Sequence, residues 1–291
     1  MSDFCLGIIA NTGKKRVAEV LPSFLTRLDE KGYSFIVSSD LARVIDLSGC
    51  RSAPAERVAD QADFILSFGG DGTFLQTARL IAPREVPIIG VNLGRFGYLA
   101  EVSVEELGER IEDLRAGRFT VQDRLMLQVE ISGEESASPC PGLNDVVVDK
   151  GGFPRSILLE TSVDGEYLNN FTADGLIVAS PTGSTGYSLS VGGPILEPGS
   201  DGLIINPISP HMLANRPLVI RGDRTIEITA FSEAGTFQVS VDGQKMLTLK
   251  SGSKVMIKRA PFATRLVVFN DFSFYDLLRN KLYWRARHND L

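Results

Sequence analysis

The sequence predicts an α/β N-terminal domain with a Rossmann-like parallel sheet, followed by an all-β, sandwich-like C-terminal domain. Two patterns support this prediction. Strand-like and helix-like segments alternate up to about residue 118, which is typical of a parallel sheet covered by helices. Beyond that point short strand-like segments follow one another closely. Turn signals such as Asp164-Gly165 and Asp242-Gly243 separate them, as in sandwiches and barrels.

The first domain is expected to span residues 1–118. Apolar runs predict its strands at residues 5–10, 33–38, 64–68 and 86–91. Helical spacing of apolar residues predicts helices at 14–30, 73–81 and 105–116. In the first helix Val17, Leu21 and Leu25 fall on one stripe, although Pro22 weakens the pattern locally.

The second domain is expected to span residues 119–270. Its predicted strands are 125–131, 145–148, 156–163, 175–179, 216–220, 225–230, 237–241 and 254–258. Residues 134–142 are rich in Ser, Pro and Glu and predict an exposed loop. A closing helix at 274–287, within a separate segment 271–291, is expected to pack back on the N-terminal domain. Its apolar face would carry Tyr275, Leu278 and Leu282.

Composition excludes several classes of function. The net charge is −6 and no dense Lys/Arg run is present, so we expect no nucleic-acid partner. No apolar run approaches the roughly 18 residues of a membrane span. The three cysteines form neither a disulfide framework nor a CxxC pair, and the N-terminus lacks the pattern of a signal peptide. We therefore expect a cytoplasmic protein without a membrane partner.

The first motif is Gly69-Gly70-Asp71-Gly72-Thr73, directly after the strand at 64–68. Glycines let a backbone approach phosphates closely, and a helix N-terminus favours anions. Asp71 would be repelled there unless it holds a metal ion or accepts a proton from an attacking hydroxyl. A simple strand-to-helix turn, with Asp71 or Thr73 as N-cap, is the competing interpretation. The motif is neither a Walker A loop nor a GxGxxG fingerprint.

The second motif, residues 174–196, is dense in hydroxyls and glycine. Hydroxyls both donate and accept hydrogen bonds, which suits a ribose or an amide. Tyr187 could stack on a flat ring. A Ser/Gly-rich surface loop is the alternative, but interleaved Leu189, Val191 and Ile195 favour a packed segment.

Together the motifs resemble those of the NAD kinase family, over nearly the whole chain. The matching segments are Gly69 to Thr73, Asn144-Asp145, residues 174–196, residues 211–217 (His-Met-Leu-Ala-Asn-Arg-Pro) and Asp242-Gly243-Gln244. Gly-Asp-Gly alone is shared with phosphofructokinases and lipid kinases, so the combination carries the resemblance. One departure is that Asp145 replaces the family's usual Glu, which keeps the charge but shortens the reach.

The resemblance implies transfer of the γ-phosphoryl of ATP to the 2′-hydroxyl of the adenosine ribose of NAD, giving NADP. It assigns Asp71 as catalytic base and places the phosphate donor at Gly69, Gly70, Gly72 and Thr73. The implied NAD-binding residues are Asp71, Gly72, Asn144, Asp145, Arg155, Thr172, Asp174, Thr185, Gly186, Tyr187, Ser188, Leu189, Ser190 and Gln244. It also implies a homo-oligomer, a homotetramer or homodimer, in which neighbouring chains help to complete the NAD site.

A divalent metal, Mg²⁺, is expected to be held mainly by the donor phosphates, because no His/Cys cluster predicts a protein metal site. His211 is open between a structural and a site role. Two other functions remain. One is a lipid or sugar kinase that uses the same Gly-Asp-Gly motif, and the other is a sensor that binds a dinucleotide without turnover. The sequence leaves open whether polyphosphate replaces ATP, whether NADH is accepted and whether NADPH inhibits.

Overall fold

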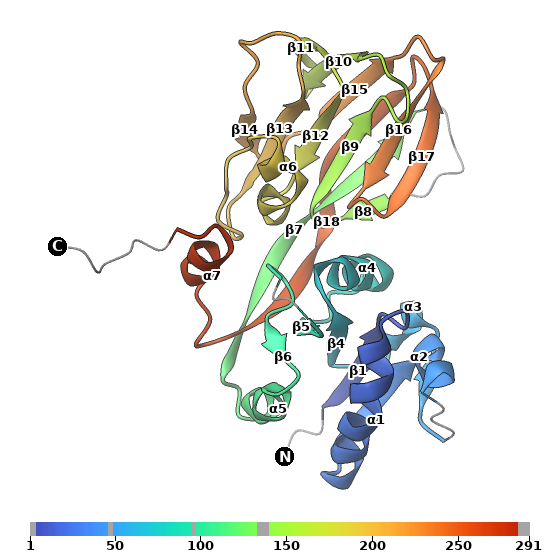
Figure 1. The fold of residues 1–291 in the computed structure, drawn as a ribbon, viewed down its shortest axis with the longest axis vertical. Helices are drawn as coiled ribbons and strands as arrows, with labels where there is room; N and C mark the ends of the chain where they lie inside the picture. Colours follow the sequence, from blue (N-terminus) through green and yellow to red (C-terminus); the bar gives the residue numbers. More distant parts are fainter. Residues whose placement is uncertain (1–3, 46–48, 95–96, 133–139, 285–291) are drawn as a thin grey trace, which may run out of the picture.

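The computed structural model describes residues 4–45, 49–94, 97–132 and 140–284. Figure 1 shows two halves stacked along the long axis of the molecule. Two long strands, β7 (Phe119–Ile131) and β18 (Lys254–Phe269), pair with each other and run from one half into the other. The chain therefore crosses between the halves at these two strands, and one sheet continues through both.

The N-terminal half contains a parallel sheet, as the sequence predicts. Its strands are β1 (Cys5–Ala10), β2 (Ser34–Ser38), β3 (Ser52–Ala53), β4 (Phe64–Gly69), β5 (Ile88–Asn92) and β6 (Val102–Ser103). Their order is β3-β2-β1-β4-β5, and every neighbouring pair is parallel. The four predicted strands are confirmed, β1 with the predicted bounds and the other three with shifted ends, whereas β3 and β6 are too short to leave an apolar pattern.

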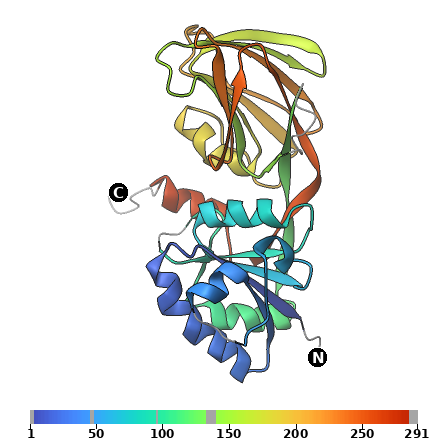
Figure 2. The ribbon, with the colours of Figure 1, turned by 90° about the vertical axis from the view of Figure 1, so that its right-hand side faces the viewer.

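Helices cover both faces of this sheet, which Figure 2 shows from the side. They are α1 (Lys15–Glu30), α2 (Ser39–Val44), α3 (Ala55–Val58), α4 (Asp71–Ile81) and α5 (Leu107–Arg115). Ile8 of β1 packs in one core cluster with residues of α1 and α5, and Ile9 packs in another with residues of α3 and α4. Because successive strand residues point to opposite faces, both faces of the sheet are buried.

The C-terminal half is a sandwich of two antiparallel layers, which confirms the predicted fold class. Its further strands are β8 (Cys140–Gly142), β9 (Asp145–Asp149), β10 (Ile157–Val163), β11 (Glu166–Ala173), β12 (Gly175–Ala179), β13 (Gly202–Ile208), β14 (Leu218–Arg221), β15 (Ile226–Phe231), β16 (Thr236–Val241) and β17 (Lys245–Lys250). One layer runs β14-β13-β12-β9-β16-β17, and the other contains β11-β10-β15-β18. Alternate residues from both layers, such as Val178 and Leu159, share one apolar cluster.

The predicted strand at 254–258 is too short, because β18 continues to Phe269. Its register with β7 shifts between Arg259 and Ala263. This irregularity carries the strand past Pro261, which a regular ladder would exclude because proline has no N–H to donate. Beyond the shift β18 also pairs in parallel with β5, through Leu266 and Ile88. The ribbon that links the halves is thus part of the N-terminal sheet.

The closing helix α7 (Phe274–Lys281) ends earlier than predicted. Tyr283 adopts φ 55°, a left-handed conformation that stops an α-helix, and residues 285–287 of the predicted helix lie outside the described residues. Lys281 Nζ lies 5.7 Å from the ring centroid of Tyr98, in the N-terminal half. Tyr275 Oη donates to Glu197 Oε1 at 3.3 Å, in the C-terminal half. The helix therefore touches both halves.

Two further expectations concern loops and membranes. Of the loop predicted at 134–142, residues 134–139 lie outside the described residues, and the remainder forms β8. Within the described ranges no helix combines the length and the apolar character that a membrane crossing requires.

Candidate functional site

The N-terminal sheet changes winding direction between β1 and β4. The chain builds β2 and β3 on one side of β1, then crosses to build β4 and β5 on the other. Ligands of open α/β sheets bind in the crevice at such a switch point, outside the carboxyl ends of the strands. Two loops meet there: Asn11 N–H donates to Phe68 O at 3.1 Å, joining the end of β1 to the end of β4. The first motif follows β4 directly and therefore lies at this crevice.

The first motif forms the end of β4 and the first turn of α4. The helix begins at Asp71 rather than at Thr73, and its N-cap is Gly70, which provides no side-chain cap. The interpretation of Asp71 or Thr73 as N-cap is therefore wrong. A Cβ on Gly69 would come within 2.0 Å of Thr73 Oγ1, so the turn requires glycine. The N–H of Thr73 already donates to Gly70 O at 2.9 Å, so the N–H groups that precede it in this turn are the ones available to an anion.

Lys14 is a neighbour of this turn that the sequence argument missed. Its Nζ lies 3.6 Å from the position that a Cβ on Gly70 would occupy. The side chain is exposed and makes no ion pair with any carboxylate in the described ranges. Asn92, paired with Gly69 in the β4–β5 ladder, is buried, and its Nδ2 has no hydrogen-bond partner there. A cation and an amide nitrogen without a partner thus flank the glycines. Lys14 lies in the loop after β1 and Asn92 is the last residue of β5, and this position at strand ends was the available signal.

Asp71 is held by the backbone of a loop 27–29 residues further along the chain. Its Oδ2 accepts the N–H of Tyr98 at 2.8 Å, and its Oδ1 accepts those of Leu99 at 2.9 Å and Ala100 at 3.1 Å. A Cβ on Gly97 would come within 1.8 Å of Oδ1, so only glycine fits there. A carboxylate has about four lone-pair sites, so one acceptor site remains after these three bonds. The loop fixes the carboxylate in one orientation.

Asp242, in the turn after β16, accepts hydrogen bonds from the backbone around the Asn144-Asp145 pair. Asp242 accepts the N–H groups of Leu143 at 2.9 Å, Asn144 at 2.7 Å and Asp145 at 3.2 Å. In return the N–H of Asp242 donates to Asp145 O at 2.9 Å. Buried backbone donors need such partners, and an ionised carboxylate makes strong ones. Asp242 thereby fixes the backbone that carries both site side chains.

Gln244, in the same turn, bridges the two halves of the molecule. Its Nε2 donates to the carbonyl oxygen of Gly72 at 2.7 Å. Its Oε1 accepts a hydrogen bond from Arg79 Nη2, on α4, at 2.9 Å. Sequence reasoning assigned Gln244 to NAD binding, a contact that stays a prediction. In the structure the amide ties the first motif to the turn that carries Asn144 and Asp145.

Unpaired acceptors gather at the Asn144-Asp145 pair. Asn144 Oδ1 and Thr182 Oγ1 are buried without a hydrogen-bond partner among the described residues. Asp145 is only 5% exposed, and no hydrogen bond from a described residue reaches its carboxylate. Burial, and after it the charge of Asp242, raises the pKa of Asp145 to about 7. Buried polar atoms without partners are rare, so this cluster indicates a ligand that donates hydrogen bonds.

The helical turns η1 (Thr182–Thr185) and α6 (Tyr187–Ser190) pack closely over this pair. A Cβ on Gly183 would come within 2.0 Å of Asn144 O, and one on Gly186 would lie 3.8 Å from Asp145 Oδ2. The segment is thus packed, as predicted, rather than a free surface loop. Asp145 and the glycines of the second motif form one wall.

Most hydroxyls of the second motif are engaged within the protein. Ser190 Oγ donates to Tyr187 O at 2.7 Å, and Thr185 Oγ1 donates to Thr182 O at 3.2 Å. Ser188 is fully buried, and its Oγ lies 3.2 Å from Asn206 Nδ2. Leu189 is partly buried, whereas Tyr187 is 46% exposed and free to cover a ring. The segment therefore shapes the wall, and Thr182 and Tyr187 offer the contacts that remain.

The other predicted NAD-binding residues lie at the far end of β12. Asp174 precedes this strand and Ser180 follows it, so about 17 Å separates its ends at ~3.3 Å per residue. Asp174 Oδ1 accepts Lys150 Nζ at 2.8 Å, and the exposed Arg155 pairs with Glu233. Thr172 O accepts the N–H of His211 at 3.0 Å. Within one chain these residues do not join the Asp145 cluster.

His211 belongs to this distal group. Its Nε2 lies 2.9 Å from Ser156 Oγ, whose hydroxyl also lies 3.5 Å from Asp174 Oδ1. The ring therefore takes part in a polar network on the sandwich, away from Asp71.

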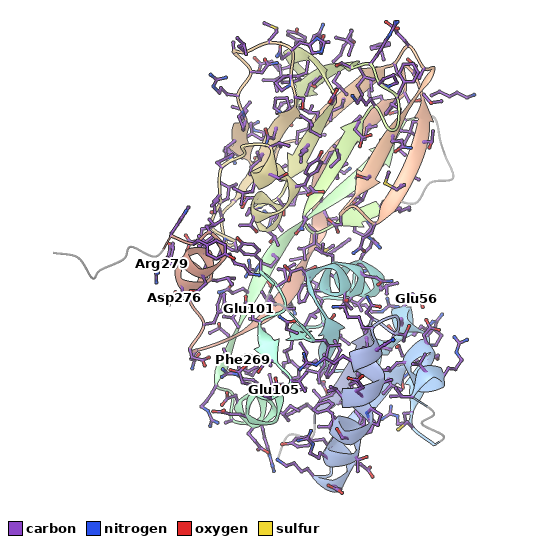
Figure 3. All side chains as sticks on the ribbon, in the orientation of Figure 1. Glu56, Glu101, Glu105, Phe269, Asp276 and Arg279 are labelled. Atoms are coloured by element: carbon purple, nitrogen blue, oxygen red, sulfur yellow. The ribbon has the colours of Figure 1, made fainter. Side chains whose placement is uncertain are left out.

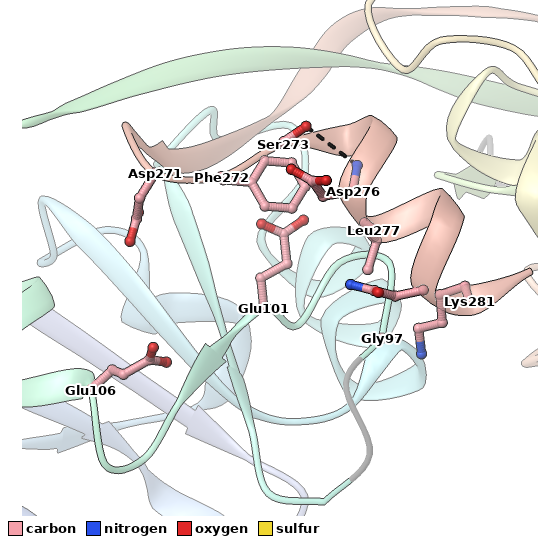
Figure 4. A pocket seen from close by; sticks show the side chains of 10 residues that line it. Gly97, Glu101, Glu106, Asp271, Phe272, Ser273, Asp276, Leu277 and Lys281 are labelled. Carbon is pink, nitrogen blue, oxygen red and sulfur yellow. Dashed lines mark hydrogen bonds between the residues drawn. The ribbon is translucent and has the colours of Figure 1, made fainter. Parts of the chain in front are cut away.

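A partly buried acid near Asp71, Glu101, was not apparent from the sequence. Burial raises the pKa of Glu101 to about 8; the charge of Arg124 opposes this shift and that of Asp71 adds to it. Burial likewise lowers the pKa of Arg124 to about 10. Figure 3 places Glu101 at the junction of the halves, and Asp276 of α7 lines the same pocket (Figure 4). No local pattern could reveal this residue, because its surroundings come from three distant segments.

The described residues contain no group of three or more His, Cys, Asp or Glu side chains arranged to hold a metal ion. The site as described therefore offers glycine backbone, Lys14 and Asp71 on one side, and the Asn144-Asp145 cluster on the other.

Comparisons with known proteins match this arrangement over both halves. The sequence profile of the ATP-NAD kinase N-terminal domain matches residues 6–119, and that of the ATP-NAD kinase C-terminal domain matches residues 143–269. The NAD kinase of Geotalea daltonii is 41% identical over 283 residues, covering 97% of this chain and 99% of the relative. That of Moorella thermoacetica is 40% identical over 278 residues, covering 95% and 88%.

Two solved structures are similar over nearly the full length. Yeast NADH kinase complexed with NADH superposes with a TM-score of 0.88 at 25% identity, covering 99% of this chain and 89% of the yeast protein. An NAD kinase from Archaeoglobus fulgidus in complex with ATP gives a TM-score of 0.75 at 25% identity, covering 97% and 100%.

Proposed function

This chain belongs to the ATP-NAD kinase family, and we propose how its residues perform the reaction of that family. The enzyme phosphorylates NAD to NADP, with ATP as donor. The observation that carries the residue assignments is the Gln244 bridge, which brings the first motif and the Asn144-Asp145 cluster together from distant parts of the chain. Phosphoryl transfer needs little covalent chemistry from a protein, so positioning of this kind is the main task.

The adenosine ribose of NAD binds at Asn144 and Asp145. Ribose hydroxyls donate hydrogen bonds, and Asn144 Oδ1, Thr182 Oγ1 and the Asp145 carboxylate are acceptors without partners in the described residues. The shorter Asp145, in place of Glu, is compensated by the close approach of Gly186. Tyr187, exposed beside this cluster, covers the adenine ring.

Asp71 accepts the proton of the 2′-hydroxyl. As the hydroxyl oxygen forms a bond to the γ-phosphorus, the bond from that phosphorus to the bridging oxygen of ADP breaks, and the proton moves to the remaining acceptor site of Asp71. The three backbone hydrogen bonds from residues 98–100 hold the carboxylate in place during this step. ADP leaves with the electron pair of the broken bond.

The donor phosphates bind at the switch point, over Gly69, Gly70, Gly72 and Thr73. The N-terminal end of α4 favours the negative charge of these phosphates, and Lys14 Nζ adds a positive charge beside Gly70. Mg²⁺ fits this arrangement when the phosphates supply most of its ligands, because the described residues contain no group of three His, Cys, Asp or Glu side chains that could hold it. When bound, it screens the phosphate charge.

We also propose a cytoplasmic homo-oligomer. Cys5, Cys50 and Cys140 are free thiols, which suits a reducing compartment. Thr172 and Asp174 lie at the opposite end of β12 from Asp145, where a neighbouring copy can bring such groups to the NAD site. The edge strand β14 exposes apolar Leu218 and Val219, and the nearby Leu213 is 92% exposed. Such an edge is commonly covered by another subunit.

The deciding experiment measures ATP consumption by the purified protein with and without NAD, together with NADP formation. Consumption that depends on NAD, with NADP as product, supports the proposal. Equal ATP consumption with a lipid or sugar acceptor would indicate a different kinase, and NAD binding without turnover would indicate a sensor. Asp71→Asn serves as the matched control, because it removes the base and keeps the shape of the turn.

A further inference from the structure

Arg79, in the last turn of α4, lies at the junction between the two halves of the molecule. In Figure 1 this helix is the part of the N-terminal half next to β8. Arg79 follows Gly72 by seven residues, about two turns of helix, so both residues occupy the same face of α4. That face meets the turn after β16, where Gln244 binds the carbonyl of Gly72 and accepts a hydrogen bond from Arg79. The start and the end of α4 are therefore held by one amide.

The guanidinium of Arg79 determines which way the amide of Gln244 points. An amide has one accepting and one donating group, whereas a guanidinium only donates. The Oε1 of Gln244 must therefore face Arg79, which leaves Nε2 to donate to Gly72 O at 2.7 Å. Gln244 is exposed, so water competes for both hydrogen bonds. Arg79 thus keeps an exposed side chain in the one orientation in which it holds the first motif.

The charge of Arg79 also acts on Asp242, which lies in the same turn and is 9% exposed. Burial raises the pKa of Asp242, whereas the N–H groups of residues 143–145 and the charge of Arg79 lower it. Burial on its own favours a neutral carboxyl, and a nearby cation favours the ionised form. Only the ionised form accepts all three backbone hydrogen bonds at full strength. Arg79 therefore supports the carboxylate that fixes the backbone at Asn144 and Asp145.

One amino group of Arg79 indicates that this residue is more than a source of stability. Its Nη1 is buried and has no hydrogen-bond partner among the described residues. A buried donor without a partner destabilises a fold, and such atoms are rare. The benefit of the guanidinium must therefore lie in the groups that it orients, the amide of Gln244 and the carboxylate of Asp242.

We propose that Arg79 is a positioning residue of the phosphoryl transfer, which sets the placement of the Asn144-Asp145 cluster relative to Asp71. It acts through Gln244 on the first motif and through Asp242 on the backbone of the cluster. This inference rests on the proposed kinase function and deepens it. The transfer requires the acceptor hydroxyl to lie within hydrogen-bond reach of its base, and a misplacement of about 1 Å can lower the rate by ~10²-fold.

The first test is Arg79→Met, which keeps the apolar stem of the side chain and removes the guanidinium. It should lower kcat by about tenfold or more, because the acceptor and the base lose their alignment. The KM for NAD should rise by roughly threefold or more, because Asp242 loses its cation, while the KM for ATP should stay within about twofold. Arg79→Lys should recover part of both losses, since it restores the charge but not the forked geometry.

Arg84→Met is the matched control. Arg84 belongs to the same half of the molecule, but it pairs with Asp60, away from the turn after β16. Its replacement removes the same group and should leave kcat and both KM values within about twofold of the unaltered protein. Thermal unfolding of each variant confirms that it is folded under the assay conditions.

Two further readouts separate positioning from a general loss of stability. The double variant Arg79→Met with Gln244→Ala should have the same kcat as Arg79→Met alone, because the effect of Arg79 on the first motif passes through Gln244. In Arg79→Ala, which leaves a space, added guanidinium ion should raise kcat toward the unaltered value. An equal concentration of sodium chloride should not.

Three results overturn the inference: a kcat within about twofold of the unaltered value in folded Arg79→Met, a double variant whose loss is the product of the two single losses, or equal changes in Arg84→Met. If Arg79→Met does not fold, the same series is measured with Arg79→Lys, and an unchanged kcat then overturns it. Failure of the kinase function itself is distinct, since it would appear as absent NAD-dependent ATP consumption in the unaltered protein.

Discussion

The buried carboxyl of Asp145 should make the stability of this protein depend on pH, and Asp145→Asn should remove that dependence. Burial and the neighbouring charge of Asp242 raise the pKa of Asp145 from 3.8 to about 7 in the folded chain. Folding therefore favours the protonated form. The stability that this group contributes is complete below pH ~4 and is lost as the pH rises through about 7, because the folded chain then holds a desolvated charge.

The size of the effect follows from the two pKa values. At ~1.4 kcal/mol per pH unit, the full loss amounts to about 4 kcal/mol, of which about 3 kcal/mol falls between pH 5 and pH 8. An asparagine at this position fills nearly the same space but does not titrate. The variant should therefore gain about 3 kcal/mol relative to the unaltered protein over the same interval. That is a large fraction of the 5–15 kcal/mol typical of a domain, about a fifth to three fifths.

The assay is urea unfolding of both proteins at pH 5, 6, 7 and 8, without NAD. Taking the difference between the two free energies of unfolding at each pH removes the contributions of the other titrating groups. A difference that grows with pH supports the reasoning. A constant difference would show that Asp145 is ionised in the folded chain at every pH tested, and the account of its burial would fail. Activity provides the second readout, since the stabilised variant should bind NAD poorly.

Four other changes test the site. Asp71→Asn should lower kcat by ~10²–10⁴ and leave the fold intact; a variant that keeps more than about a tenth of kcat would exclude Asp71 as base. Asp145→Ala should raise the KM for NAD far more than the KM for ATP, since ~1.5–3 kcal/mol of ribose binding is lost, and equal effects would contradict the ribose assignment. Gln244→Ala removes the bonds to Gly72 and Arg79 and should reduce kcat about tenfold with little change in either KM; a change confined to the KM for NAD would instead make it a binding residue. Finally, specific activity should fall on dilution in step with dissociation seen by sedimentation, and a fully active monomer would refute the proposed oligomer.

The sequence by itself determined the parts that depend on local pattern. The strands Cys5–Ala10 and Gly175–Ala179 have the predicted bounds, because a buried strand is a short apolar run with turn residues at its ends. The alternation of strands and helices also determined the layered N-terminal half. The glycines at the end of β4 indicated a turn that can approach phosphates closely, with a simple strand-to-helix turn as the competing interpretation. The resemblance to a known family added the reaction.

Only the tertiary structure decided what surrounds these motifs. Asp71 receives its hydrogen bonds from residues 98–100, and Gln244 reaches Gly72 across 172 residues of chain. The raised pKa of Glu101 and the cavity beneath α7 likewise depend on segments that meet only after folding. A sequence pattern reports which face of an element is apolar, but hydrogen-bond partners, burial and charge are properties of packing between elements. The sequence therefore determined the motifs on which the proposed site rests, and the packing decided which of their atoms lack a partner within the protein.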